Sequence, residues 1–174
     1  MSTPPWITRT QNKLRNTINK YNKNLAPLGL RVKRFGNPDY FEVVYGNGNQ
    51  KSNIRVNTNP YLLSANLIGG GTYENNRGKG IGLALRTFAV AVLRNAGFVK
   101  VKHQGVTFQN RNNASRAKTG NVPISTYMVR KYLGFRPMGN ASNHRSIWRP
   151  NSTRLAKLKN AEGLSRNKLK AILN

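Results

Sequence analysis

The feature that most constrains this chain is a glycine-rich segment that opens directly onto an apolar helix, between Asn75 and Gly97. Arg77, Gly80 and Gly82 form the pattern Arg-x-x-Gly-x-Gly. Apolar residues then recur at three- and four-residue spacing, which predicts an amphipathic helix. The residues on its apolar face are Ile81, Leu85, Phe88, Ala89, Val92 and Leu93. Gly97 follows in the place where a left-handed residue commonly ends a helix.

The start of this helix is a candidate anion site. The first N–H groups of a helix have no partners inside it, and that end of the helix carries partial positive charge. Glycines let an anion approach the backbone closely, so the segment predicts a cradle for phosphate or pyrophosphate. A flexible surface turn that merely begins a helix is the alternative, because a short Gly-x-Gly match is weak by itself.

The segments on either side of the cradle extend the pattern. Tyr61 to Ile68 is a strand-like run, Phe98 to Val106 begins with alternating residues, and a later predicted helix ends in Leu133-Gly134-Phe135. This order of elements resembles the acyl-CoA-binding core of the GNAT N-acetyltransferases, over about residues 61–148. The resemblance implies acetyl-CoA as the cofactor. The residues whose backbone would hold its pyrophosphate are Arg77, Gly78, Lys79, Gly80, Ile81 and Gly82.

Acetyl transfer to an amine also needs a base and an acid, because the amine must be neutral and the thiolate must be protonated. Glu74 is the carboxylate next to the cradle, and is either the base or a turn residue that helps to neutralise Arg77. In the family a tyrosine commonly stands four residues before the glycine of Leu-Gly-Phe, where this chain has Arg130. Tyr127 lies closer to that direction around a helix than Tyr132 does, so Tyr127 is the candidate acid.

The charge of the chain is the second constraint. It has 30 Lys and Arg against 4 Asp and Glu, a formal net charge of +26. Such a charge is tolerated most easily beside a polyanion or an acidic assembly, so nucleic acid is the predicted partner, through salt-dependent phosphate contacts. A solvated basic surface with no dedicated partner is the alternative. The same field would repel cationic amine acceptors.

Composition excludes several other sites. Cysteine is absent, and His103 and His144 have no acidic cluster beside them, so we expect neither disulfides nor a metal centre. No apolar run reaches the length of about 20 residues that a membrane span needs, and the N-terminus lacks a hydrophobic signal block. We therefore expect a protein of the cytoplasm or of a nucleoprotein particle, for example a virion, and not a secreted one.

The remaining segments predict one α/β domain over residues 1–150, with a central mixed, mostly antiparallel sheet flanked by helices. A helix over 5–24 precedes strands over 30–35, 40–45 and 51–56. Residues 107–121 form a polar, basic loop, followed by a helix from about 122 to Leu133. Residues 151–174 form a basic helical extension, which Gly163 is expected to split into two short helices. This extension either packs on the domain or contacts a partner.

Three functions remain open. The first is a GNAT-like N-acetyltransferase acting on an unidentified acceptor. The second is a catalytically inactive GNAT-fold protein that serves as a basic structural component of a nucleoprotein assembly. The third is a non-specific nucleic-acid-binding protein whose cradle holds backbone phosphate.

Overall fold

The computed structural model of the chain describes residues 2–71, 76, 78–105, 122–139 and 145–174. It contains one seven-stranded sheet with the strand order β1-β2-β3-β4-β5-β7-β6. The strands are β1 (Leu30–Arg34), β2 (Tyr40–Tyr45), β3 (Ser52–Asn59), β4 (Ser64–Leu67), β5 (Lys100–Gln104), β6 (Arg136–Pro137) and β7 (Arg145–Trp148). Only the β4–β5 pair is parallel, as a connection through a helix requires, and the other neighbours are antiparallel. The predicted mixed, mostly antiparallel sheet is confirmed.

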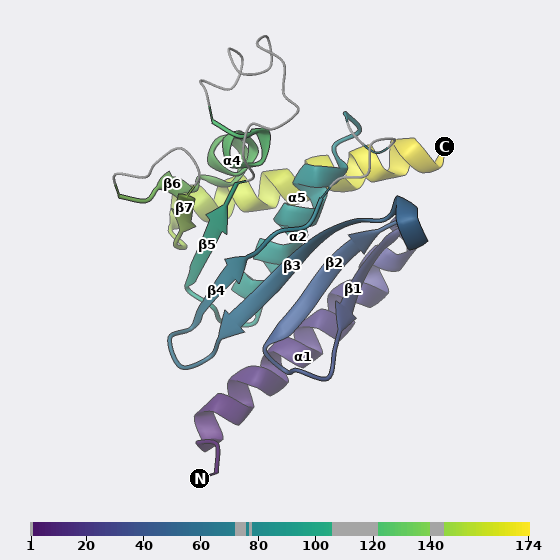
Figure 1. Cartoon of the computed structure of the whole chain (residues 1–174). Helices are drawn as coiled ribbons and strands as arrows, with labels where there is room; N and C mark the ends of the chain where they lie inside the picture. Colours follow the sequence, from purple (N-terminus) through teal and green to yellow (C-terminus); the bar gives the residue numbers. More distant parts are fainter. Residues whose placement is uncertain (1, 72–75, 77, 106–121, 140–144) are drawn as a thin grey trace.

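Four α-helices accompany the described strands. They are α1 (Pro5–Leu25), α2 (Ile81–Asn95), α4 (Ile124–Met128), which continues as a π-helical turn over Val129–Leu133, and α5 (Ser152–Leu173). Figure 1 shows α1, α2 and α5 together behind the strands. The predicted helices at both ends of the chain are therefore present. No described helix is long and apolar enough to span a membrane.

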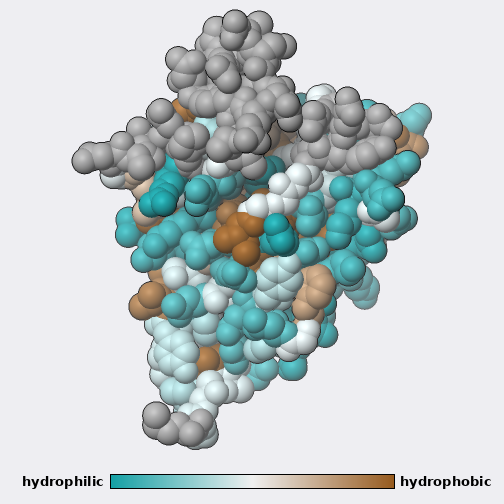
Figure 2. All heavy atoms as spheres, in the orientation of Figure 1, coloured by the Kyte–Doolittle hydropathy of each residue, from teal (hydrophilic) through white to brown (hydrophobic). Residues whose placement is uncertain are grey.

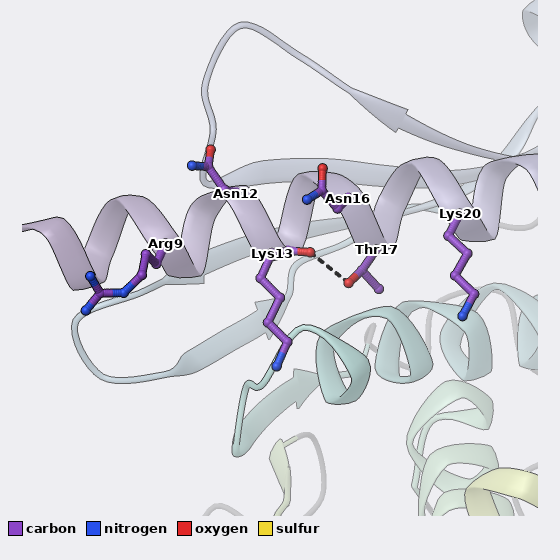
Figure 3. Close-up of a pocket in the computed structure, with 6 residues that line it drawn as sticks. All are labelled: Arg9, Asn12, Lys13, Asn16, Thr17 and Lys20. Atoms are coloured by element: carbon purple, nitrogen blue, oxygen red, sulfur yellow. Dashed lines mark hydrogen bonds between the residues drawn. The ribbon is translucent and has the colours of Figure 1, made fainter.

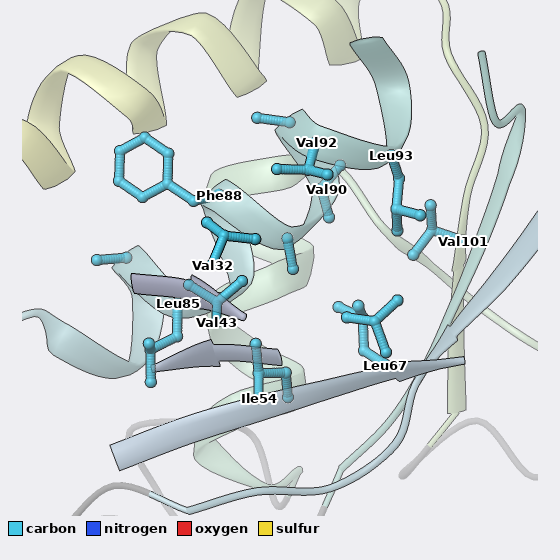
Figure 4. Close-up of a cluster of buried hydrophobic side chains, with 14 of the residues drawn as sticks. Val32, Val43, Ile54, Leu67, Leu85, Phe88, Val90, Val92, Leu93 and Val101 are labelled. Atoms are coloured by element: carbon cyan, nitrogen blue, oxygen red, sulfur yellow. The ribbon is translucent and has the colours of Figure 1, made fainter. Parts of the chain in front are cut away.

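The helices pack on one face of the sheet because the strands alternate. Phe41 of β2, Val56 of β3 and Leu67 of β4 are paired in register and are all buried on the helical side. Against them lies α2, in which twelve of the fifteen residues are buried, so it is the central helix of the core (Figure 4). Burial of this apolar area supplies most of the driving force for folding.

Two boundaries differ from the sequence-based expectation. The strand expected from Tyr61 begins at Ser64, because Asn59 Oδ1 accepts from the Tyr61 N–H and the chain turns over residues 60–63. The C-terminal segment is one continuous helix, not two, since Gly163 lies inside α5. A glycine in a helix costs about 1 kcal/mol, and the buried face of α5 outweighs that cost. That face consists of Leu158, Ala161, Ser165 and Leu169.

Candidate functional site

The glycines of the predicted cradle lie directly before α2. Gly78 and Gly80 have φ angles of 77° and 83°, in the left-handed region that favours glycine. Gly80 is the residue before the helix, no side-chain hydrogen bond caps it, and the first turn carries no acidic residue. The first backbone bond of the helix runs from the Ala84 N–H to the Gly80 carbonyl, at 3.0 Å. The N–H groups of Ile81, Gly82 and Leu83 precede this bond, and such groups have no carbonyl partner inside a helix.

The cradle has room on one side and a lysine on the other. A Cβ on Gly78 would meet nothing within 4 Å, whereas a Cβ on Gly80 would lie 2.6 Å from Cδ of Lys168. Lys168 belongs to α5, so the C-terminal helix brings its aliphatic stem across the start of α2. Lys79 is exposed beside it. Sequence spacing could not place residue 168 here, because only the packing of α5 on α2 does so. Arg77 lies outside the described residues.

Strands β4 and β5 separate next to this cradle. They are paired from Ser64 with Lys100 as far as Leu67 with His103. Beyond Leu67 the chain stays with β3, since the Ile68 N–H donates to the Arg55 carbonyl at 2.8 Å and the Arg55 N–H donates to the Gly69 carbonyl at 3.0 Å. The end of β5 is left unpaired with β4.

Below the cradle lies a buried basic pair that sequence analysis did not identify. The Nε–H of Arg86, on α2, donates to Nε2 of His103 at 3.2 Å, and its Nη1 donates to the Gly82 carbonyl at 2.9 Å. Burial lowers the pKa of Arg86 to about 10. Burial, together with the charges of Arg86 and Arg130, lowers the pKa of His103 to about 3, so the imidazole is neutral. Its Nδ1 is buried and has no hydrogen-bond partner among the described residues.

The described carboxylates all have other roles. Asp39 accepts from Gln11 at 3.0 Å, Glu42 accepts from the Tyr40 hydroxyl at 2.7 Å, and Glu162 accepts from the Tyr21 hydroxyl at 3.3 Å. None of these bonds involves the cradle. Glu74, the candidate base, lies outside the described residues. Among the residues that are described, no three His, Asp or Glu side chains gather in a group that could hold a metal ion.

The candidate acid stands on α4, among cationic groups. The Lys131 ammonium lies 5.6 Å from the ring centroid of Tyr127 and 5.2 Å from that of Tyr132. Hydrogen bonding to Tyr127, followed by the charges of both tyrosines, raises the pKa of Lys131. Arg130, in the position where the family carries tyrosine, donates to Ser146 Oγ at 2.8 Å and joins the helix to β7. The role of Tyr127 as an acid remains a prediction.

A second basic feature lies on the outer face of α1. A shallow pocket of about 400 Å³ follows the helix there (Figure 3). The residues that line it are Arg9, Asn12, Lys13, Asn16, Thr17 and Lys20. The side chain of Lys13 extends from this face toward the C-terminal end of α2, with Nζ 3.7 Å from where a Cβ on Gly97 would lie. This pocket is separate from the cradle, which is at the opposite end of α2.

Comparison with solved structures finds similar folds in acyltransferases. An aminoglycoside 6′-N-acetyltransferase in complex with coenzyme A is 14% identical, over 86% of this chain and 95% of that one, with a TM-score of 0.45. A CoA-dependent acyl-homoserine lactone synthase is 12% identical, over 90% and 82% of the two chains, with a TM-score of 0.43. Gcn5 from Tetrahymena is 10% identical, over 83% and 86%, with a TM-score of 0.40.

No protein-family model and no curated protein sequence matches this chain. The solved structures named above match at low sequence identity and at TM-scores below 0.5. The mixed sheet, the glycine loop before the central helix and the diverging β4 and β5 stand in the order that the sequence resemblance implied. The assignment of a function depends on the site.

Proposed function

We propose that this protein binds acetyl-CoA at the start of α2 and transfers the acetyl group to an acceptor. The observation that carries the proposal is the start of α2, which no described side chain caps and which left-handed Gly78 and Gly80 form beside the point where β4 and β5 diverge. An anion held there completes the hydrogen bonding of the first helical turn.

The residues fit a pyrophosphate. The N–H groups of the first turn of α2 supply the donors, and the open space at Gly78 admits the anion. Lys79 and Lys168 supply cations, and the positive end of the helix adds to their field. Arg86, buried one turn further along α2, keeps its guanidinium charge at neutral pH even with its lowered pKa of about 10.

Bound acetyl-CoA would supply a thioester, whose acetyl carbon forms a bond to the acceptor while the C–S bond breaks and the thiol leaves with the acceptor's proton. The chain contributes binding, orientation and a positive field. Nearby positive charge disfavours the protonated form of an amine. The net positive charge of the chain would therefore favour the neutral form of a bound amine, which is the task of a general base elsewhere. The acceptor favoured by this field is neutral or anionic.

Calorimetric titration with acetyl-CoA at low and high salt tests the binding step. Gly80→Asp places a carboxylate and a Cβ where the anion approaches and where Lys168 lies, so we expect saturable binding to fall at least a hundredfold. Gly36→Asp is the matched control, since it adds the same charge at an exposed turn where a Cβ meets nothing within 4 Å. Equal affinity of the two variants would contradict the cradle.

Release of free thiol from acetyl-CoA, measured with a panel of neutral and anionic amines, tests the transfer step. Release that depends on both an amine and an intact cradle supports the enzyme. Binding without release would favour a second candidate, a GNAT-fold protein that no longer catalyses acyl transfer. The observation in favour of this candidate is that each described carboxylate is bonded elsewhere.

A further inference from the structure

No described helix packs on the face of the sheet opposite α1, α2 and α5, which we call the open face. Figure 1 shows the strands in front, with α1, α2 and α5 behind them, and no described helix packs on the near side. Strand register identifies the side chains on this open face. Glu42 of β2 stands between Lys33 of β1 and Arg55 of β3, whereas the flanking residues Phe41 and Val43 point into the core.

Basic residues lie on the open face at β1, β3, β5, β6 and β7. The basic residues that the register places on it are Arg31, Lys33, Arg55, Lys100, Lys102, Arg136 and Arg145. Glu42 is the one acid there among the described residues, and it is buried and accepts a hydrogen bond from Tyr40. The field of this surface is therefore uncompensated, and its complement is a row of negative charges.

Amide side chains line the middle of the same face. Asn57 of β3 is paired with Asn66 of β4, both are exposed, and Lys102 of β5 is next in that row. An asparagine amide both donates and accepts, so it can bond the edge of an unpaired base as well as a phosphate. Acidic protein side chains, in contrast, would use the cations and leave the amides without a specific role.

Aromatic rings stand at the β1–β2 edge of the face. Phe35, which follows Lys33 on the same side of the chain, is 42% exposed. Its ring lies 4.9 Å from that of Tyr40, and Lys33 Nζ lies 5.8 Å from the Phe35 centroid. A ring next to cations is the arrangement on which unpaired bases stack.

We propose that the open face, defined by its basic residues together with Asn57, Asn66, Phe35 and Tyr40, binds single-stranded nucleic acid. Phosphates would contact the cations of β1, β3 and β5, and a base would stack on Phe35. Figure 2 shows this side of the molecule, where hydrophilic residues surround a small apolar centre. A single strand fits better than a duplex, because exposed rings and amides need unpaired bases. This activity does not depend on acetyl-CoA binding.

Fluorescence anisotropy with a labelled 20-nucleotide deoxythymidine strand tests the proposal on the full chain. The sheet variant Lys33→Gln, Arg55→Gln, Lys102→Gln removes three phosphate contacts. We expect it to bind about 30-fold more weakly near 0.1 M salt and to lower the log–log salt slope by about 2. The control variant Arg9→Gln, Lys13→Gln, Lys20→Gln removes the same charge from the outer face of α1. The affinity of this control variant for the strand should fall by less than about threefold.

Phe35→Ala separates stacking from charge. We expect the affinity for the single strand to fall about tenfold and its salt slope to stay unchanged. The affinity for a duplex of the same length should change little. Thermal unfolding confirms that each variant is folded. Equal losses in the sheet and α1 variants would overturn the proposal, because the charge would then act without a defined site. A duplex bound more tightly than the strand and insensitive to Phe35→Ala would also overturn it. So would displacement of the strand by polyglutamate at equal charge concentration, which would favour an acidic protein partner.

Discussion

The two faces of the sheet are built from the same strands and have opposite chemistry. On β3, Ile54 is buried against the helices, and the next residue, Arg55, is exposed on the open face. The helical face contains the hydrophobic core and supports the cradle, whereas the open face contains cations and amides. Because a strand alternates with a period of two, one sequence can specify a core and an interaction surface in the same eight residues. Stability should therefore depend on the first face, and polyanion binding on the second.

The largest expected effect is a difference in stability between a variant of Ile54 and a variant of its neighbour Arg55. Ile54→Ala deletes three buried carbons from the core and should cost about 3 kcal/mol of unfolding free energy. Arg55→Ala should change it by less than about 0.5 kcal/mol, since its side chain is exposed. Urea unfolding followed by circular dichroism measures both. A large loss in Arg55→Ala would mean that another part of the chain packs on the open face.

The pH dependence of stability tests the buried pair on the helical side. His103 has a pKa of about 3 in the fold and 6.5 when unfolded, so below pH 6.5 the unfolded chain binds a proton that the folded chain does not. The contribution of the neutral His103 to the free energy of unfolding is complete above pH 6.5. It declines by about 1.4 kcal/mol per pH unit as the pH falls toward 3. Between pH 6.5 and 5 the expected loss is about 2 kcal/mol.

His103→Gln keeps an acceptor for Arg86 without the titration. Unfolding curves at a series of pH values should show a shallower decline for this variant than for the wild type. Identical declines in the two proteins would show that His103 is not buried as a neutral imidazole.

A smaller effect is expected from the hydrogen bonds that join the helices to one another. The Tyr21 hydroxyl on α1 donates to Glu162 on α5 at 3.3 Å and accepts from Asn95 on α2 at 3.0 Å. Burial, followed by the charge of Glu162, raises the pKa of Tyr21 to about 12, so the hydroxyl keeps its proton. Tyr21→Phe should cost about 1 kcal/mol. No change in the thermal midpoint would show that the three helices are not tied at this point.

The smallest predicted effect is stabilising. Gly163 lies inside α5, and a Cβ there would meet nothing within 4 Å. Gly163→Ala should raise the unfolding free energy by about 0.7 kcal/mol, because alanine restricts the unfolded chain and favours the helix. Thermal unfolding measures this gain. A loss of stability would indicate that α5 is not continuous through residue 163.

Local pattern was sufficient for most of the fold. Alternation predicted β1 and β2, helical spacing predicted α1 and α2, and turn residues separated them. The prediction was wrong at Gly163 because tertiary burial of Leu158 and Leu169 outweighed a local helix-breaking preference. The beginning of β4 was misplaced because the Asn59 side chain holds a turn that a strand-like run did not reveal.

Some features of the candidate site also follow from the sequence, and others follow only from tertiary packing. The sequence by itself determined the glycine cradle, since only glycine adopts the left-handed angles of Gly78 and Gly80 at low cost. It also determined the excess of positive charge. The tertiary structure alone decided that Lys168 lies across the cradle, that Arg86 meets His103 beneath it, and that no described helix covers one side of the sheet. These contacts join residues far apart in the chain, so they follow from how whole helices pack and not from any local period.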